Sequence, residues 1–455
     1  MSISVVLGSH RGSPCKLINL RVNRVKVGFI CQPWESGGPP HPGGSIGLLT
    51  WELARRLAQS CGVVVCGLHS EDQAADECVD GVQFHRFGLG LDQWVLDRPR
   101  RLRGPLDNSR KDIDSLLYCA LYALRCAKRL HAEGCDIIHL HNFSQFLPIV
   151  RMLNPRAKLV LHMNCDWLVQ FERKVIGRRL RHADAIIGCS EYITDKVRKR
   201  FPQYADRCAT VYNGADVGAF TDQTGGRRGG KHFIFVGRVS PEKGVHVLLE
   251  AFKNVAAEMP DVELTVVGGA DIPPISFIVE PSRDPLVRGL RSFYKSTYMK
   301  NLQNKAATIA TKVSFIGFVA HSELGNFFNA ADIFVHPCVW GEPLGMSVIE
   351  AMAAGLPVIA SRTGGLRESV VEAETGLLVE PNDVEALAAA MLRLASHQKM
   401  SLDMGTAGAR RARERFSWDV VVARLLSLYR AMESGLPFPE LSPLPKRCGL
   451  TYTAA

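Results

Sequence analysis

Two glutamates eight positions apart, Glu342 and Glu350, lie in the segment GEPLGMSVIEAMAAGLPVIASRTGGLRES. Pro343 and Gly345 predict a helix start, which the apolar run 346–354 continues. Eight residues of helix span about 12 Å, so the two carboxylates cannot form a close acid/base pair. This separation suits an elongated ligand with hydroxyls at both ends and anionic charge between them. A nucleotide-sugar has that shape.

The same segment contains two sets of backbone amides that could hold a phosphate. A short buried strand is expected at 358–360, and Gly364 and Gly365 then open the next helix. The first turn of a helix has amides without internal partners, and such amides bind anions. We therefore expect a phosphate or diphosphate site at Gly345, Gly364 and Gly365.

Two cations flank a Ser-Pro helix start in FVGRVSPEKGVHVLLEAF, directly after an expected strand. Arg238 and Lys243 beside free amides predict a cradle for an anion. The alternative interpretation is a pair of surface charges around a turn.

Two histidines, His139 and His141, occupy the C-terminal end of the expected strand in DIIHLHNFS, where α/β proteins bind ligands. The alternative is that either histidine is structural. A zinc site would need a third ligand, and none is evident at a recognisable spacing.

The first strand leads into the loop GGPPHPGGS, which includes Gly43 and Gly44. Its spacing differs from the GxGxxG turn of dinucleotide-binding folds, although glycines still allow close approach to an anion. A flexible connecting loop is the alternative. Asp112 and Asp114 resemble a metal-binding DxD pair, but they precede an expected helix, where capping is the simpler role. We infer no metal.

The composition is that of a globular protein, 46% apolar and 22% charged, with 13 scattered cysteines. No apolar run approaches the roughly 18 residues of a membrane span, and the N-terminus lacks the pattern of a signal peptide. Because the cysteines form no CxxC pair, we expect reduced thiols and a cytoplasmic location.

The positive charge is concentrated in the first half. Residues 1–217 hold 30 Lys+Arg and 21 Asp+Glu, a balance of +9, whereas residues 218–455 hold 25 and 24, a balance of +1. Basic clusters lie at 98–104, 172–182 and 196–200. They could attract an anionic membrane, an acidic glycan or a phosphorylated acceptor, or they are solvated helix faces. Nucleic acid is not expected, because no interleaved aromatics or binding motif accompany the charge.

Strands alternate with helices in both halves, and the pattern restarts near residue 232. This order predicts an α/β protein with two doubly wound, Rossmann-like domains facing a central cleft. The expected divisions are a disordered extension (1–24), a first domain (25–217), a hinge (218–231), a second domain (232–416), a final helix (417–433) and a loose tail (434–455). Residues 271–292 are expected to form an inserted loop near the strand ends.

Four segments together resemble retaining glycosyltransferases of family 4, which have the GT-B fold: GRVSPEKG, the E-x7-E stretch, GGLRE and TGLLVEPND. The resemblance covers residues 25–433. It implies transfer of a hexosyl unit from a UDP- or GDP-sugar to a hydroxyl of a glycan or lipid-linked acceptor, without a metal. Cell-envelope or exopolysaccharide synthesis is the implied setting, with peripheral contact to an anionic membrane.

The resemblance also implies residue roles. Glu342 would contact the donor sugar, Glu350 the ribose, and Arg238 and Lys243 the diphosphate, while His141 would lie near the sugar and acceptor. Further donor contacts are implied for the Glu342 loop, the glycine turns and the first-domain loop: Leu344, Gly345, Gly364, Gly365, Gly43 and Gly44.

The resemblance implies a front-face attack in which the departing phosphate takes the acceptor proton. Asn164 and Asp166 stand where members often carry histidine and glutamate, and Leu344 stands in place of phenylalanine. The alternatives are a non-catalytic sugar-nucleotide-binding protein and a GT-B sugar-nucleotide epimerase.

Overall fold

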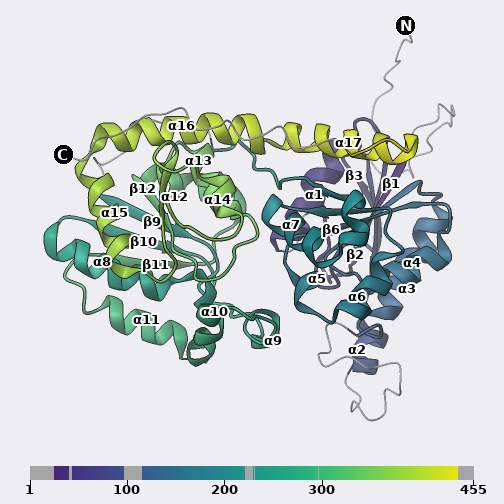
Figure 1. Cartoon of the computed structure of the whole chain (residues 1–455), viewed down its shortest axis with the longest axis horizontal. Helices are drawn as coiled ribbons and strands as arrows, with labels where there is room; N and C mark the ends of the chain where they lie inside the picture. Colours follow the sequence, from purple (N-terminus) through teal and green to yellow (C-terminus); the bar gives the residue numbers. More distant parts are fainter. Residues whose placement is uncertain are drawn as a thin grey trace, which may run out of the picture.

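The computed structural model describes residues 25–39, 44–96, 115–220, 229, 231–295 and 297–438. The predicted extension 1–24, the basic cluster 98–104, the aspartates of the DxD-like pair, most of the predicted hinge and the end of the tail lie outside the described residues. Two sheets form two α/β domains, which lie side by side (Figure 1).

The first domain is built on an eight-stranded sheet in the order β3-β4-β2-β1-β5-β6-β7-β8. All its neighbouring strands are parallel except β3 and β4, which pair antiparallel. The alternation of strands and helices predicts a parallel sheet, so this antiparallel pair was not expected. The strands are β1 (Lys26–Ile30), β2 (Gly62–Leu68), β3 (Asp76–Val79), β4 (Val82–Phe87), β5 (Ile137–His141), β6 (Lys158–Met163), β7 (Ala185–Gly188) and β8 (Cys208–Thr210).

Helices cover both faces of this sheet, which is why its central strands β1 and β5 are buried almost throughout. Along β1, Phe29 packs into the core on one face and Ile30 into the core on the other. The predicted helix from about residue 114 begins only at Ala120. The helices are α1 (Ser45–Leu57), α2 (Gly90–Leu96), α3 (Ala120–Ala132), α4 (Phe146–Leu153), α5 (Trp167–Gln170), α6 (Arg173–Leu180), α7 (Glu191–Arg200) and the 3-10 helix η3 (Pro202–Arg207).

The second domain has a six-stranded parallel sheet in the order β11-β10-β9-β12-β13-β14. Its strands are β9 (His232–Val236), β10 (Glu263–Val267), β11 (Val313–Gly317), β12 (Ile333–His336), β13 (Val358–Ser361) and β14 (Gly376–Val379). Its helices are η4 (Pro241–Lys243), α8 (Val245–Glu258), α9 (Ile275–Ile278), α10 (Pro285–Gly289), η5 (Leu290–Phe293), α11 (Tyr298–Ala306), η6 (His321–Glu323), α12 (Leu324–Ala330), α13 (Met346–Ala353), α14 (Leu366–Ser369), α15 (Val384–Ser396) and α16 (Gln398–Phe416).

The last helix, α17 (Trp418–Ser434), begins one residue after the predicted start at 417 and returns to the first domain, where it packs against α1 (Figure 1). Trp418 is buried against Gly214, where an added Cβ would lie 2.5 Å from the indole ring. The amide of Ala215 donates to the Phe416 carbonyl at 2.7 Å. The outgoing and returning crossings between the domains therefore lie side by side.

Candidate active site

The structure brings Glu342 and Lys243 together from two loops of the second domain. The carboxylate of Glu342 accepts from the Lys243 ammonium at 2.7 Å and from the Trp340 indole Nε1 at 2.7 Å. Lys243 ends η4 after β9, whereas Glu342 lies in the loop between β12 and α13. Because β9 and β12 are parallel neighbours, their following loops meet at one edge of the sheet.

The Glu342 carboxyl is held ionised although it is buried. Burial by itself raises its pKa, but the attraction of Lys243 outweighs that cost and places the pKa below its usual range. His336 lies 4.0 Å away, and burial lowers its pKa, so its imidazole is neutral at pH 7. The site thus presents a fixed carboxylate that can accept hydrogen bonds from ligand hydroxyls.

Arg238 also faces a carboxylate, which the sequence analysis did not assign. Its guanidinium donates to Glu242 at 2.8 Å, and Glu242 also accepts from the hydroxyls of Ser240 and Tyr294, each at 2.7 Å. The Ser-Pro start opens only the three-residue helix η4. The predicted cradle therefore carries both signs, since each cation is paired with a glutamate.

The amides of the glycine turns have different roles. Gly345 is the N-cap of α13 with φ 84°, and among the described residues its amide and that of Met346 have no acceptor. The Gly365 amide instead donates to the Glu342 carbonyl at 2.8 Å, so in this structure it is not free to donate to a phosphate. An added Cβ at Gly364 or Gly365 would lie 2.1 or 2.2 Å from backbone oxygens of the Glu342 loop. These two glycines allow the loops to pack together.

Glu350 lies in α13 and opens onto a different cavity. It accepts from the His321 Nε2 at 2.8 Å, and this bond raises the pKa of His321. The cavity has a volume of about 220 Å³ and is lined by α1, residues 214–220 and α13; we call it the linker pocket. Between the two glutamates only residues 346–350 are helical, so the 12 Å estimate, which assumed one continuous helix between them, does not hold.

The predicted histidines lie in the core of the first domain. His139 bonds the Tyr429 hydroxyl of α17 at 2.7 Å and His162 at 3.1 Å, which is a structural role. His141 is 1% exposed and stacks on Phe29, and neither ring nitrogen has a hydrogen-bond partner among the residues that the structure describes. It does not line the linker pocket, and its place beside a donor sugar stays a prediction.

His162 supplies the third histidine that the sequence spacing did not reveal. Nitrogens of His139, His141 and His162 lie within 4.8 Å of one another, as do ligand atoms of a second group, His336, Cys338 and Glu342. In the first group both His139 nitrogens are already bonded, and in the second Glu342 is held by Lys243. These existing bonds compete with metal coordination at both places.

Two further predicted donor contacts have structural roles. Leu344 is 2% exposed and packs in a core cluster that also contains first-domain residues, so its side chain is not a ligand contact. Gly44 is the N-cap of α1, and an added Cβ would lie 3.2 Å from the Glu35 carboxylate. Burial raises the pKa of Glu35 to about 7. Gly43 lies outside the described residues.

Glu368 of the GGLRE motif contacts the other domain, which the motif itself did not predict. Glu368, in α14, accepts from the amides of Glu191 and Tyr192 at 2.8 and 2.7 Å. It also accepts from the Tyr212 hydroxyl at 3.1 Å. A carboxylate of the second domain therefore caps α7 of the first, which fixes one side of the contact between the domains.

Comparisons with known proteins cover both halves of the chain. Residues 46–218 match the model described as Glycosyltransferase Family 4, and residues 219–411 match Glycosyl transferases group 1. The D-inositol 3-phosphate glycosyltransferase of Corynebacterium urealyticum is 30% identical over 368 residues, 75% of this chain and 81% of that protein. Spore coat protein SA of Bacillus subtilis is 26% identical over 352 residues, 72% and 88%.

Solved structures show the same architecture. The crystal structure of Anabaena Alr3699/HepE in complex with UDP superposes with a TM-score of 0.65 at 19% identity, covering 90% of this chain and all of that one. The two facing Rossmann-like domains are therefore a GT-B fold, as predicted.

Proposed function

Because the chain belongs to glycosyltransferase family 4, we propose that it transfers a hexosyl unit from a UDP- or GDP-sugar to a hydroxyl of a glycan or lipid-linked acceptor. The observation that carries the proposal is the ion pair between Lys243 and Glu342, two residues far apart in sequence that meet beside unpaired amides of the α13 start. The pair offers a carboxylate for sugar hydroxyls next to a cation for phosphate.

The chemistry follows from where charge develops. Cleavage of the donor builds negative charge on the leaving diphosphate, and fixed cations and amides lower that barrier. We assign this role to Lys243, Arg238 and the α13 start. The proposed reaction retains the anomeric configuration through front-face attack, with the leaving phosphate accepting the acceptor proton. It requires no metal.

The test begins with a thermal-shift screen of UDP-, GDP- and ADP-sugars, because a bound donor raises the melting temperature. UDP-sugars come first, since the solved HepE structure contains UDP. The donor found is then incubated with and without EDTA, and nucleotide release is measured. We expect release with both treatments, and a loss of at least about 100-fold in Lys243→Ala, by analogy with the removal of one oxyanion donor.

Lys253→Ala, on the exposed face of α8, is the matched control. NMR of the product anomer tests retention. Tight donor binding without turnover, across varied acceptors, would instead support a non-catalytic sugar-nucleotide-binding protein.

We further propose that the enzyme acts in the cytoplasm at an anionic membrane, in cell-envelope or exopolysaccharide synthesis. Among the residues that the structure describes, no helix has both the length and the apolar character needed to cross a bilayer. The exposed cations Arg173, Lys174 and Arg178 of α6 support peripheral contact. Vesicles with anionic lipid should retain the protein at low salt and release it at high salt. Equal retention on neutral vesicles would refute this part.

A further inference from the structure

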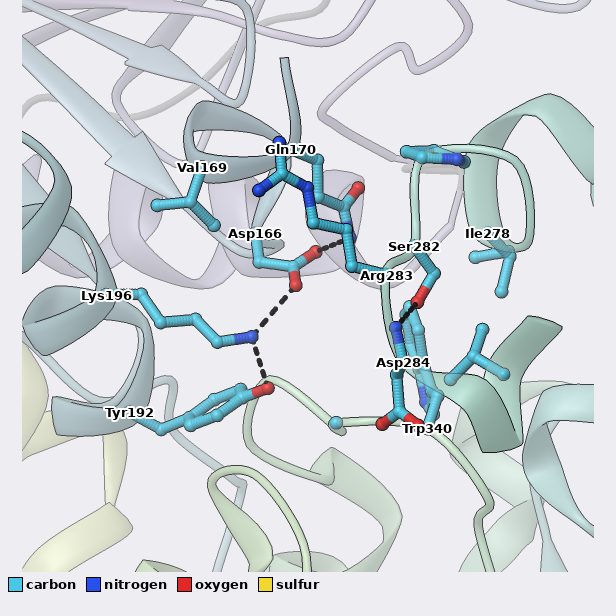
Figure 2. Close-up of a pocket in the computed structure, with 13 residues that line it drawn as sticks. Asp166, Val169, Gln170, Tyr192, Lys196, Ile278, Ser282, Arg283, Asp284 and Trp340 are labelled. Atoms are coloured by element: carbon cyan, nitrogen blue, oxygen red, sulfur yellow. Dashed lines mark hydrogen bonds and ion pairs between the residues drawn. The ribbon is translucent and has the colours of Figure 1, made fainter. Parts of the chain in front are cut away.

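A second cavity, about 200 Å³ in volume, lies between the two domains (Figure 2). Asp166, Gln170 and Lys196 line it from α5 and α7 of the first domain, and residues 282–284 line it from the insert between β10 and β11. Trp340 lines it from the loop between β12 and α13. We call this cavity the insert pocket. The sequence predicts no role for this insert.

The first-domain side of the insert pocket is a fixed polar surface. The Asp166 carboxylate accepts from Gln170 Nε2 at 2.6 Å and from the Lys196 ammonium at 3.0 Å, while Lys196 also donates to the Tyr192 hydroxyl. Burial by itself lowers the pKa of Lys196, but Asp166 and Tyr192 outweigh it and raise the pKa, so the ammonium stays charged. The Gln170 Oε1 is buried, has no partner within the described part of the chain, and can accept a hydrogen bond.

The insert side carries one cation and one anion. The Arg283 side chain is exposed and extends from the insert toward α5 (Figure 2), and no described residue pairs with it. Asp284 accepts from the Leu286 amide at 2.9 Å and is otherwise open to ligand. The lining therefore contains two cations and two carboxylates, and its formal charge is zero.

This balance selects against a charged occupant. An anion bound by Arg283 would meet the carboxylates of Asp166 and Asp284, whereas a hydroxyl group both donates and accepts and is satisfied by every group present. The volume is below the roughly 300–1,000 Å³ of pockets for drug-sized ligands, so it suits a single small ring. The Trp340 indole offers an apolar face beside the polar groups.

The insert pocket adjoins the proposed transfer site, because the Trp340 that lines it donates to Glu342. We propose that the insert pocket binds one uncharged sugar ring of the acceptor, and that Arg283 is a specificity-determining residue for that ring. This inference rests on the proposed function. It gives the insert a role, since the acceptor contacts both domains and is held only when the insert lies against α5.

The experiment compares Arg283→Ala with Arg291→Ala, which removes a neighbouring exposed arginine of the insert that does not line the pocket. The acceptors are methyl hexopyranosides, methyl hexuronosides and hexose 6-phosphates, with acceptor-dependent nucleotide release as the readout. We expect the uncharged glycosides to be preferred. Arg283→Ala should raise their KM about tenfold, with the donor KM and the Arg291→Ala values as in the wild type.

Preference for the charged acceptors would overturn the proposal, as would equal changes of donor and acceptor KM in Arg283→Ala. If the wild type neither releases nucleotide nor hydrolyses any donor, the proposed function fails, and the pocket is tested alone. Saturation-transfer NMR with the methyl hexopyranosides should then show binding that Arg283→Ala weakens and Arg291→Ala retains. If this NMR experiment shows no saturation transfer from the protein to the methyl hexopyranosides, the assignment of the insert pocket is refuted.

Discussion

Replacing Lys243 with methionine should destabilise the second domain in a pH-dependent way. Without its partner, the Glu342 carboxylate would be an unpaired charge, 9% exposed at its side chain. Breaking a buried pair from one side costs about 3–5 kcal/mol. The protein can limit this loss by protonating Glu342, which costs about 1.4 kcal/mol for each pH unit above the unfolded pKa of about 4.3.

That limit sets the size of the effect. At pH 7.5 the loss cannot exceed about 4.4 kcal/mol, whereas at pH 5.5 it cannot exceed about 1.6 kcal/mol. In the wild type, Glu342 causes no change in the free energy of unfolding between pH 7.5 and 5.5. Its pKa in the folded protein is depressed, so the carboxyl stays ionised in both the folded and the unfolded state. The sign is therefore fixed: the Lys243→Met deficit shrinks as the pH falls.

Differential scanning calorimetry at pH 7.5 and 5.5 measures the deficit. For a domain of this size, about 1 kcal/mol shifts the melting temperature by about 2–4 °C, so the deficit should differ by up to about 6–11 °C between the two pH values. Lys253→Met is the control on α8 and should show no such difference. Adding Glu342→Gln to Lys243→Met should recover most of the loss at pH 7.5. A deficit that is equal at both pH values would refute the buried ionised pair.

Three further predictions concern residues around the site. Glu368→Ala should lower the melting temperature, because it leaves two α7 amides without their acceptor and reduces the free energy of unfolding by about 1–3 kcal/mol. A double-mutant cycle of Glu368→Ala with Tyr212→Phe should show that the two changes are not additive, because the Tyr212 hydroxyl donates to Glu368. Gly365→Ala should cost about 1–3 kcal/mol by overpacking against the Pro343 carbonyl, whereas calorimetry of Gly289→Ala, where the added Cβ meets nothing within 4 Å, should show no loss. The raised pKa of His321 means that its bond to Glu350 stabilises the fold fully below about pH 6.5 and loses that effect as pH rises through the folded pKa. His321→Gln should therefore cost more at pH 6 than at pH 9, by less than about 1 kcal/mol because the side chain is partly exposed, and an unchanged difference in melting temperature would contradict the assignment.

Features that depend on local patterns were predictable from the sequence. Gly345 precedes α13 as the N-cap, and α17 begins at Trp418, because glycine turns and apolar periodicity act over a few residues. The parallel second sheet follows from the alternation of buried strands with helices. The family resemblance implied separate roles for Lys243 and Glu342 in one donor site, and their ion pair was not predicted.

Features that depend on long-range partners were not predictable. Nothing near Glu368 indicates that its carboxylate accepts from amides 177 and 176 positions away. The pairing of Arg238 with Glu242 was missed because a glutamate at a turn is usually exposed, whereas this one is fully buried. The β3–β4 pair was missed because DECV is polar and exposed on alternate residues, as an edge strand is.

The chain crosses between the domains twice, at Ala215 and at Ser417, and these adjacent crossings limit how one domain can rotate relative to the other. Two tethers at one rim act as a pivot, and displacement in a rotation grows with distance from its axis. Helix α9 lies at the opposite rim from α16 and α17 (Figure 1), so the insert travels farthest for any given angle. Small rotations near the tethers would open a wide entrance there, and large substrates would enter and depart from that side.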